Sequence, residues 1–103
     1  MTKLSILYTT FPSKEEAESL AQKVLSEKLA ACVNIFPAGR SLYLWEGRLE
    51  ESAEYYVIFK TLPDLLEDLE RYIINNHSYD TPAILKIEAQ SSKAFFDYVR
   101  QEI

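Results

Sequence analysis

The sequence has little of several residue types, and each scarcity excludes a class of protein. It contains one cysteine, one histidine and two glycines in 103 residues. A single cysteine excludes an internal disulfide and makes a closed tetrahedral zinc site within one chain very improbable. Two glycines, Gly39 and Gly47, are too few for a loop that cradles phosphates. Because no Gly-x-Ser-x-Gly motif is present either, we predict that the chain is not an enzyme.

Long hydrophobic runs and basic patches are also missing. No apolar run approaches the roughly 18 residues that cross a bilayer, and the N-terminus shows no secretory signal. Acidic residues number 16 against 11 basic ones, and no basic stripe is available to bind a phosphate backbone. We therefore expect a cytoplasmic protein that binds neither nucleic acid nor membrane, and the lone cysteine fits a reducing compartment.

The sequence does supply enough apolar material for one core. Hydrophobic residues make up 48% of the chain. A domain of this length buries somewhat over about 60% of its unfolded surface, whereas two halves without disulfides would each be too small. We expect a single domain that spans residues 1–103.

Strand and helix signals alternate along the chain. Alternating or dense apolar residues predict strands over residues 4–9, 31–35, 41–45, 48–59 and 83–89. Ser13 and Glu16 have the spacing of a capping box that begins the first helix. Pro63 suits the first turn of a second helix, and Ser91 or Ser92 caps the last one.

This order, βαββαβ plus a terminal helix, predicts an α+β fold, the ferredoxin-like split βαβ sandwich with an antiparallel sheet. Glu46-Gly47 is a plausible turn of a long hairpin whose tip should project beyond the domain. The helices cover one face of the sheet, and the other face must also be covered. Aromatic residues on the hairpin and long open edges favour pairing with another chain, so we expect an oligomer with Tyr43 and Trp45 at the interface.

Two residues that could carry chemistry occur once each. Cys32 has neighbours typical of a buried, small hydrophobic residue, and the alternative is a soft metal ligand or redox thiol. His77 ends the second helix, where it either caps the last carbonyl groups or acts as a ligand or proton-transfer group in a cleft. The residues alone leave both alternatives open.

The hairpin combines aromatic and acidic residues. Base stacking on a sheet would require lysine, arginine and glycine among the aromatic positions, but the neighbours here are glutamates. Core or subunit contacts are therefore favoured for Tyr43, Trp45, Tyr55 and Tyr56. The glutamates form either a solvated surface or a cluster that attracts a divalent cation weakly.

Several segments of the chain, taken together, form the pattern of a known family. They are Thr9-Thr10-Phe11-Pro12, Leu29-Ala30-Ala31-Cys32-Val33-Asn34-Ile35, Ser41-Leu42-Tyr43-Leu44-Trp45-Glu46-Gly47, Lys60-Thr61 and His77-Ser78-Tyr79-Asp80-Thr81-Pro82. In this order, and over essentially the whole chain, they resemble the CutA divalent-cation-tolerance family. The resemblance implies a ferredoxin-like protomer that forms a homotrimer similar to PII signalling proteins. It also implies a link to tolerance of copper and other divalent metals.

The resemblance also suggests residues for a site. Carried over by motif, Cys32 and His77 are candidate metal ligands, with Tyr79, Asp80 and Glu54 near the same cleft. One thiolate and one imidazole are only two ligands, so we expect weak binding of a divalent metal, copper foremost, at a subunit junction. The alternative is a PII-like signalling or interaction module that binds a small molecule or a partner protein, with metal binding incidental. A largely structural trimer is a third reading.

Overall fold

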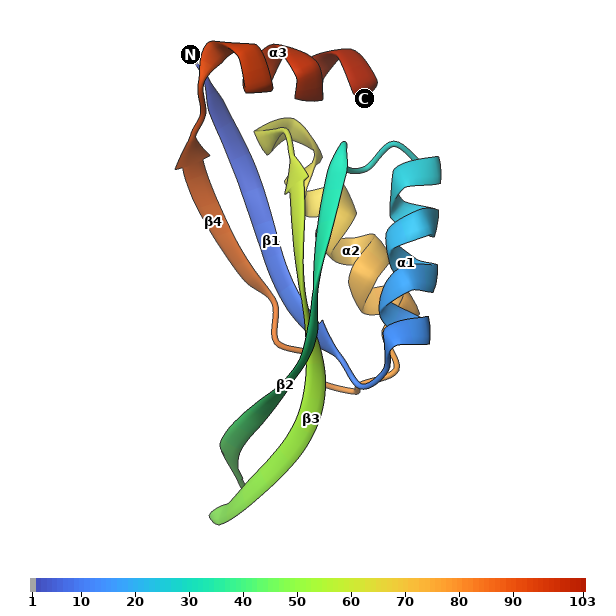
Figure 1. Cartoon of the computed structure of the whole chain (residues 1–103), viewed down its shortest axis with the longest axis vertical. Helices are drawn as coiled ribbons and strands as arrows, with labels where there is room; N and C mark the ends of the chain where they lie inside the picture. The colour runs from blue at the N-terminus through green and yellow to red at the C-terminus, as the bar shows by residue number, and fades with distance from the viewer. Residues whose placement is uncertain (1) are drawn as a thin grey trace.

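The structure is a computed structural model that describes residues 2–103, and it places two helices against one face of a four-stranded sheet (Figure 1). In chain order the elements are β1 Lys3–Phe11, α1 Lys14–Ser26, β2 Cys32–Trp45, β3 Arg48–Thr61, a 3-10 turn Pro63–Leu65, α2 Leu66–Asn76, β4 Leu85–Gln90 and α3 Lys93–Glu102. This is the predicted order of strands and helices. Met1, which the one-domain prediction includes, lies outside the described residues.

The sheet has the strand order β2-β3-β1-β4, and all three pairings are antiparallel. The predicted ferredoxin-like fold is therefore confirmed at the level of topology. The two predicted segments 31–35 and 41–45 belong to one strand, because a register shift between Phe36 and Gly39 absorbs the interruption. Pro37 lies in this shift on an edge strand, where its missing N–H leaves no ladder hydrogen bond unmade.

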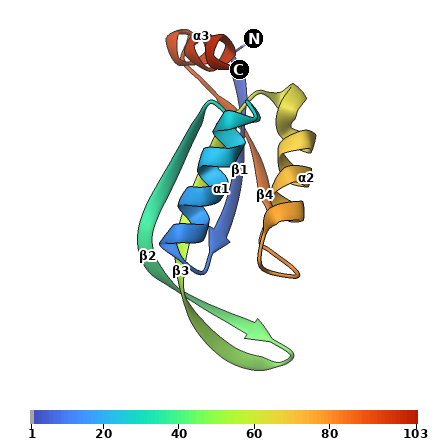
Figure 2. The same ribbon diagram turned by 90° about the vertical axis from the view of Figure 1, so that its right-hand side faces the viewer.

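The core lies between the sheet and the helices α1 and α2, which pack on the same side of it (Figure 2). The side chains that fill it alternate along β1 and β3 and recur at helical spacing along α1 and α2. They include Leu7, Phe11, Val57 and Phe59 from the sheet and Leu20, Val24, Leu69 and Ile73 from the helices. Ser13 begins α1 as predicted, since its Oγ accepts the backbone N–H of Glu16 at 3.1 Å.

The opposite face of the sheet has no helix over it within residues 2–103 (Figures 1 and 2). Cross-strand partners share a face, so Tyr8 and Ile58 lie on this open face, as do Ile6 and Ile87. Leu85 and Ile87 remain 56% and 50% exposed. The apolar side of β4, predicted to be half-buried, is thus left open within one copy of the chain.

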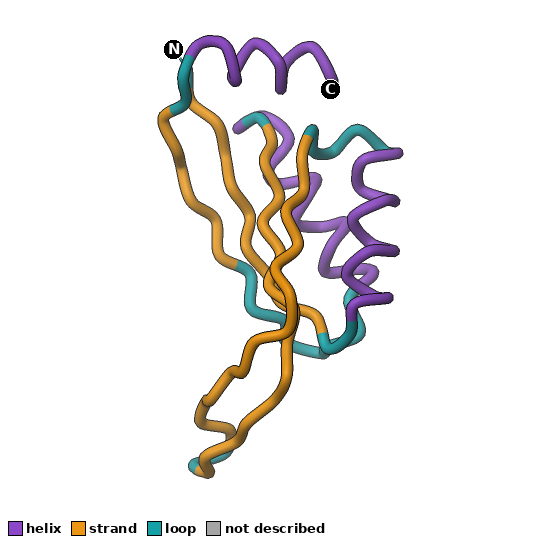
Figure 3. Tube along the Cα trace, in the orientation of Figure 1, coloured by secondary structure: helices purple, strands orange, loops and turns teal. Residues whose placement is uncertain are grey.

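The hairpin formed by β2 and β3 extends well beyond the body, as predicted (Figure 3). The molecule measures 44 × 24 × 23 Å, and the hairpin accounts for its long axis. Glu46 and Gly47 form the turn with positive φ angles of 51° and 77°, as a tight hairpin requires. Trp45 is 55% exposed beside this turn.

Helix α3 lies across the end of the sheet at which β1 begins (Figure 1). Ser92, rather than Ser91, caps it, because the Ser92 Oγ accepts the backbone N–H of Phe95 at 3.3 Å. The backbone N–H of Ser91 donates to the Thr2 carbonyl oxygen at 2.8 Å and ties the helix to the start of β1. Among residues 2–103, no helix is both long and apolar enough to cross a membrane.

Candidate functional site

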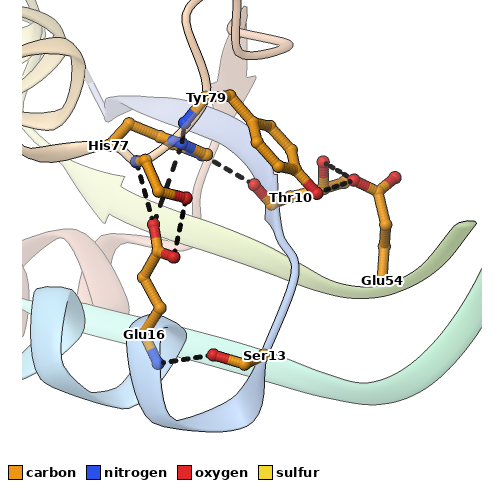
Figure 4. A network of polar contacts seen from close by, with 7 residues as sticks. Thr10, Ser13, Glu16, Glu54, His77 and Tyr79 are labelled. Atoms are coloured by element: carbon orange, nitrogen blue, oxygen red, sulfur yellow. Dashed lines mark hydrogen bonds and ion pairs between the residues drawn. The ribbon is translucent and has the colours of Figure 1, made fainter.

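The His77 ring joins the loop after α2 to the end of β1 (Figure 4). Its Nε2 lies 2.7 Å from the carbonyl oxygen of Thr10, and its Nδ1 lies 3.0 Å from the backbone nitrogen of Tyr79. A carbonyl oxygen only accepts and a backbone N–H only donates, so the ring is neutral with its proton on Nε2. The ring also stacks on Phe11, with centroids 4.5 Å apart and an angle of 11° between the planes.

These contacts exclude one of the two roles predicted for the His77 side chain, that of a cap on the last carbonyl groups of α2. The ring does not cap α2, since the Asn76 side chain donates to the Tyr72 carbonyl oxygen at 2.8 Å instead. The capping prediction for the imidazole is therefore wrong. The side chain of His77 is 0% exposed and both of its nitrogens are hydrogen-bonded. As a metal ligand it stays a prediction, and one that requires this loop to rearrange.

Glu16, on α1, holds the same loop through two hydrogen bonds from Ser78. The Glu16 carboxylate accepts the backbone N–H of Ser78 at 3.1 Å and the Ser78 hydroxyl at 2.8 Å. Its Oε2 also lies 3.9 Å from the Nδ1 of His77. Only half of the predicted capping box is therefore present, because the Glu16 side chain turns to the loop. A proline at position 78 would have no N–H to donate here.

Glu54 is the best-buried carboxylate of the site, with 8% of its surface exposed. Its Oε2 accepts hydrogen bonds from the Thr10 hydroxyl at 3.0 Å and from the Tyr79 hydroxyl at 2.8 Å. Burial first, and then the hydrogen bond to Glu54, raises the pKa of the Tyr79 phenol. The Oε1 atom has no hydrogen-bond partner among residues 2–103 and points away from both hydroxyl groups (Figure 4).

A cleft of about 650 Å³ opens beside this network, between the hairpin and the loop after α2. It brings together most of the residues that the sequence suggested for a site or an interface. Of these, Glu54 and Asp80 supply carboxylates, and Tyr43, Trp45 and Tyr79 supply aromatic rings. His77 does not line the cleft but lies behind Tyr79, with the two rings 4.9 Å apart.

Cys32 does not line this cleft. It pairs with Lys60 on β3, whereas Thr10 pairs with Tyr56, four residues or roughly 13 Å away along the same strand. Cys32 is partly exposed, so the prediction of a buried cysteine is wrong for a single copy. The structure does not bring Cys32 and His77 together. Within residues 2–103, no three His, Cys, Asp or Glu side chains are grouped so that they could hold a metal ion.

Sequence reasoning did not identify Thr10, Glu16 and Ser78 as residues of the site. Their partners are far away in the chain, at a sequence separation of 44 for Thr10 and Glu54 and of 62 for Glu16 and Ser78. No local pattern reports such contacts. The only signal was that Thr10 and Ser78 lie inside two of the family-like segments.

The chain is similar in sequence to known proteins. Residues 5–102 match the family model described as "CutA1 divalent ion tolerance protein". The divalent-cation tolerance protein CutA of Archaeoglobus fulgidus is 39% identical over 100 residues, which cover 96% of this chain and 97% of that protein. Protein CutA 1, chloroplastic, of Oryza sativa is 44% identical over 82 residues, or 80% of this chain. That match covers 46% of the rice protein, so the chain spans less than half the length of this relative.

A solved structure agrees with the sequence matches. The crystal structure of the divalent ion tolerance protein CutA1 from Ehrlichia chaffeensis superposes with a TM-score of 0.94 at 37% identity, covering 99% of this chain and 96% of that one. The family predicted from the motifs is thus confirmed by a match that runs over nearly the whole chain. The chain belongs to the CutA1 family of divalent ion tolerance proteins.

Proposed function

We propose that the protein is a homotrimer that binds a divalent cation, copper(II) foremost, weakly at the junctions between subunits. The observation that carries this proposal is the pair of carboxylates, Glu54 and Asp80, in one cleft beside the imidazole of His77. An imidazole with carboxylates suits copper(II) or zinc better than magnesium. The proposal also includes a cytoplasmic location and the absence of catalysis, although the rice relative is named a chloroplastic protein.

The apolar surfaces support the trimer. Leu85 and Ile87 on the open face are about half exposed, and Trp45 is exposed on the projecting hairpin. Surfaces of this kind on a folded chain are typical of contacts with another subunit. A closed, symmetric assembly would bury the same patch on every copy and would remove the open edges of β2 and β4.

The same geometry explains why metal binding should be weak. The residues that one copy supplies in the described part of the chain do not make a complete site. Symmetry can add ligands from a neighbouring subunit. His77 joins only after its Nδ1 gives up the Tyr79 N–H, and the loss of that hydrogen bond opposes binding.

Calorimetric titration of untagged, metal-free protein with copper(II) tests the metal proposal. We expect His77→Ala to weaken binding by roughly tenfold, because one nitrogen ligand is lost. Glu54→Gln should weaken it as well. Cys32→Ala is the matched control, since Cys32 lies about 13 Å along the sheet from the cleft. Unchanged copper affinity in both His77→Ala and Glu54→Gln would mean that metal binding is adventitious.

A second candidate function is that of a PII-like signalling module that binds a small molecule in the cleft. The cleft's volume of about 650 Å³ favours this candidate, because small-molecule sites commonly measure about 300–1,000 Å³. Titration with organic compounds in the presence of a chelator separates it from the metal proposal.

A further inference from the structure

The open face of the sheet carries opposite charges at its two ends, the hairpin end and the end beside α3 (Figure 1). Three carboxylates, those of Glu50, Glu54 and Asp80, line the cleft at the hairpin end, and no lysine, arginine or histidine is among its lining residues. At the α3 end, the Lys60 ammonium lies 5.4 Å from the centre of the Phe95 ring. Glu50 and Lys60 are ten residues apart on β3, or roughly 33 Å along the strand, so they do not meet within one copy.

The α3 end presents this cation among aromatic rings. Phe95 stacks on Tyr98 with ring centroids 5.7 Å apart, and Tyr98 is 45% exposed. The Lys60 ammonium takes part in none of the ion pairs within residues 2–103. A ring face attracts an ammonium but does not neutralise it, so Lys60 keeps its charge for a carboxylate.

The hairpin end presents the opposite arrangement. Glu50 pairs across the hairpin with Tyr43, and both residues line the cleft together with Trp45. Glu54 is buried there and already accepts hydrogen bonds from two hydroxyl groups. Glu50 is exposed and forms no ion pair in the described part of the chain. Of the two hairpin carboxylates in the cleft, Glu50 is therefore the one that is free for a partner.

An apolar strip joins the two ends. Ile6, Ile58, Leu85 and Ile87 share the open face through their positions in the strand pairing. A partner that covers this strip must bring a cation to the hairpin end and a carboxylate to the α3 end. A second copy of the chain in head-to-tail order supplies both. Like ends placed side by side would instead set carboxylates against carboxylates, which is unfavourable.

We propose that Lys60 of a second copy completes the acidic cleft by pairing with Glu50. The hairpin rings of the first copy, Tyr43 and Trp45, then lie beside Phe95 of the second. Each copy gives its hairpin end to one neighbour and its α3 end to the other, which is the heterologous contact that closes a ring. This inference rests on the proposed homotrimer and names the residues that meet in it.

Charge reversals on both sides of the contact test the inference. Native mass spectrometry of mixed isotope-labelled and unlabelled protein gives the mass of the assembly and the rate at which subunits exchange. We expect Glu50→Lys and Lys60→Glu each to speed exchange roughly tenfold, because like charges then meet. The double variant Glu50→Lys/Lys60→Glu restores an ion pair and should exchange within about threefold of the wild-type rate.

Further variants control for charge and for folding. Glu15→Lys makes the same charge change at an exposed position of α1, on the helical side of the sheet, and should leave the exchange rate unchanged. If Lys60→Glu folds poorly by circular dichroism, Lys60→Met takes its place, because it keeps an apolar chain beside Phe95 and removes only the charge. Combined with Glu50→Gln, it should then cost less than the sum of the two single changes.

The outcomes separate this contact from the homotrimer itself. Rescue by the double variant, with Glu15→Lys unaffected, supports the contact. Effects of Glu50→Lys and Lys60→Glu that simply add, or single reversals without effect, overturn it and leave the two ends to another partner. A wild-type dimer with the same rescue overturns the homotrimer but keeps the contact. A wild-type monomer overturns both.

Discussion

Tyr56 and Gly39 face each other across the hairpin, and the Tyr56 ring occupies the space that a β-carbon at position 39 would need. The Tyr56 hydroxyl donates to the Arg40 carbonyl oxygen at 3.2 Å, next to the register shift of β2. The absence of a side chain at Gly39 therefore lets the ring fix the point at which the hairpin leaves the body.

Gly39→Ala should for this reason destabilise the protein. The added methyl group displaces the Tyr56 ring and breaks its hydrogen bond to Arg40, which costs about 1–3 kcal/mol of unfolding free energy. Urea unfolding followed by circular dichroism measures the change. In a Tyr56→Ala background the same substitution should cost little, because the ring is no longer there. Equal costs in both backgrounds would show that crowding by Tyr56 is not the cause.

Local signals in the sequence predicted the elements well. Ser13 and Ser92 are the N-caps of their helices, and Glu46-Gly47 is the turn of the hairpin. Each of these signals depends on residues within three positions of one another. The sequence predicts two segments, 31–35 and 41–45, where the structure has one strand, because an edge strand can absorb one register shift and continue.

The site was less predictable for a physical reason. Glu16 and His77 each have a local role that sequence patterns indicate, an acidic partner in a capping box and a cation at a helix end. In the fold both give up that role for partners on other elements, Ser78 and Thr10. Cys32 was judged from apolar neighbours, but strand alternation places it on the open face of the sheet.

Trp45→Ala tests the assembly. A tryptophan can bury up to about 250 Å², and Trp45 is more than half exposed in a single copy. We expect the variant to form a weaker trimer and to melt several degrees lower, since 1 kcal/mol corresponds to about 4–8 °C in a domain of this size. Light scattering and thermal melts measure both. Leu25→Ala is the control, because Leu25 is an exposed leucine on α1, away from the hairpin. A wild-type monomer at micromolar concentration would contradict the trimer itself.

Ser78→Ala tests how the loop after α2 is held. The substitution removes the hydroxyl that donates to Glu16 but keeps the backbone N–H at the same position. We expect a loss of about 0.5–1.5 kcal/mol in stability and faster hydrogen exchange at the Tyr79 N–H, which donates to His77. Ser91→Ala, which removes a hydroxyl group bonded only to a neighbouring carbonyl, is the control. Unchanged exchange at Tyr79 would show that the hydrogen bond from the Ser78 hydroxyl to Glu16 does not restrain the loop.

We expect the protein to become less stable in alkaline solution, because the Tyr79 phenol ionises more readily in the unfolded chain than in the folded one. Burial, and then the hydrogen bond and charge of Glu54, raises the pKa of the Tyr79 phenol above its ordinary value near 10. Between the ordinary and the raised value the unfolded chain loses this proton while the folded chain keeps it. The contribution of Tyr79 to stability is therefore complete below pH 10 and declines as the pH rises further.

Tyr79→Phe should therefore flatten this dependence. The variant is less stable than the wild type at pH 8, because the Thr10–Glu54 hydrogen bond remains but the one from Tyr79 is lost. From pH 9 to pH 11 the difference in unfolding free energy between the wild type and the variant should narrow, since only the wild type carries a phenol at position 79 that resists ionisation. Urea unfolding at several pH values measures the gap. Tyr98→Phe provides the comparison, because Tyr98 lies exposed on α3, far from Glu54 in the chain. A gap that stays constant across this range would show that Glu54 does not hold the Tyr79 proton.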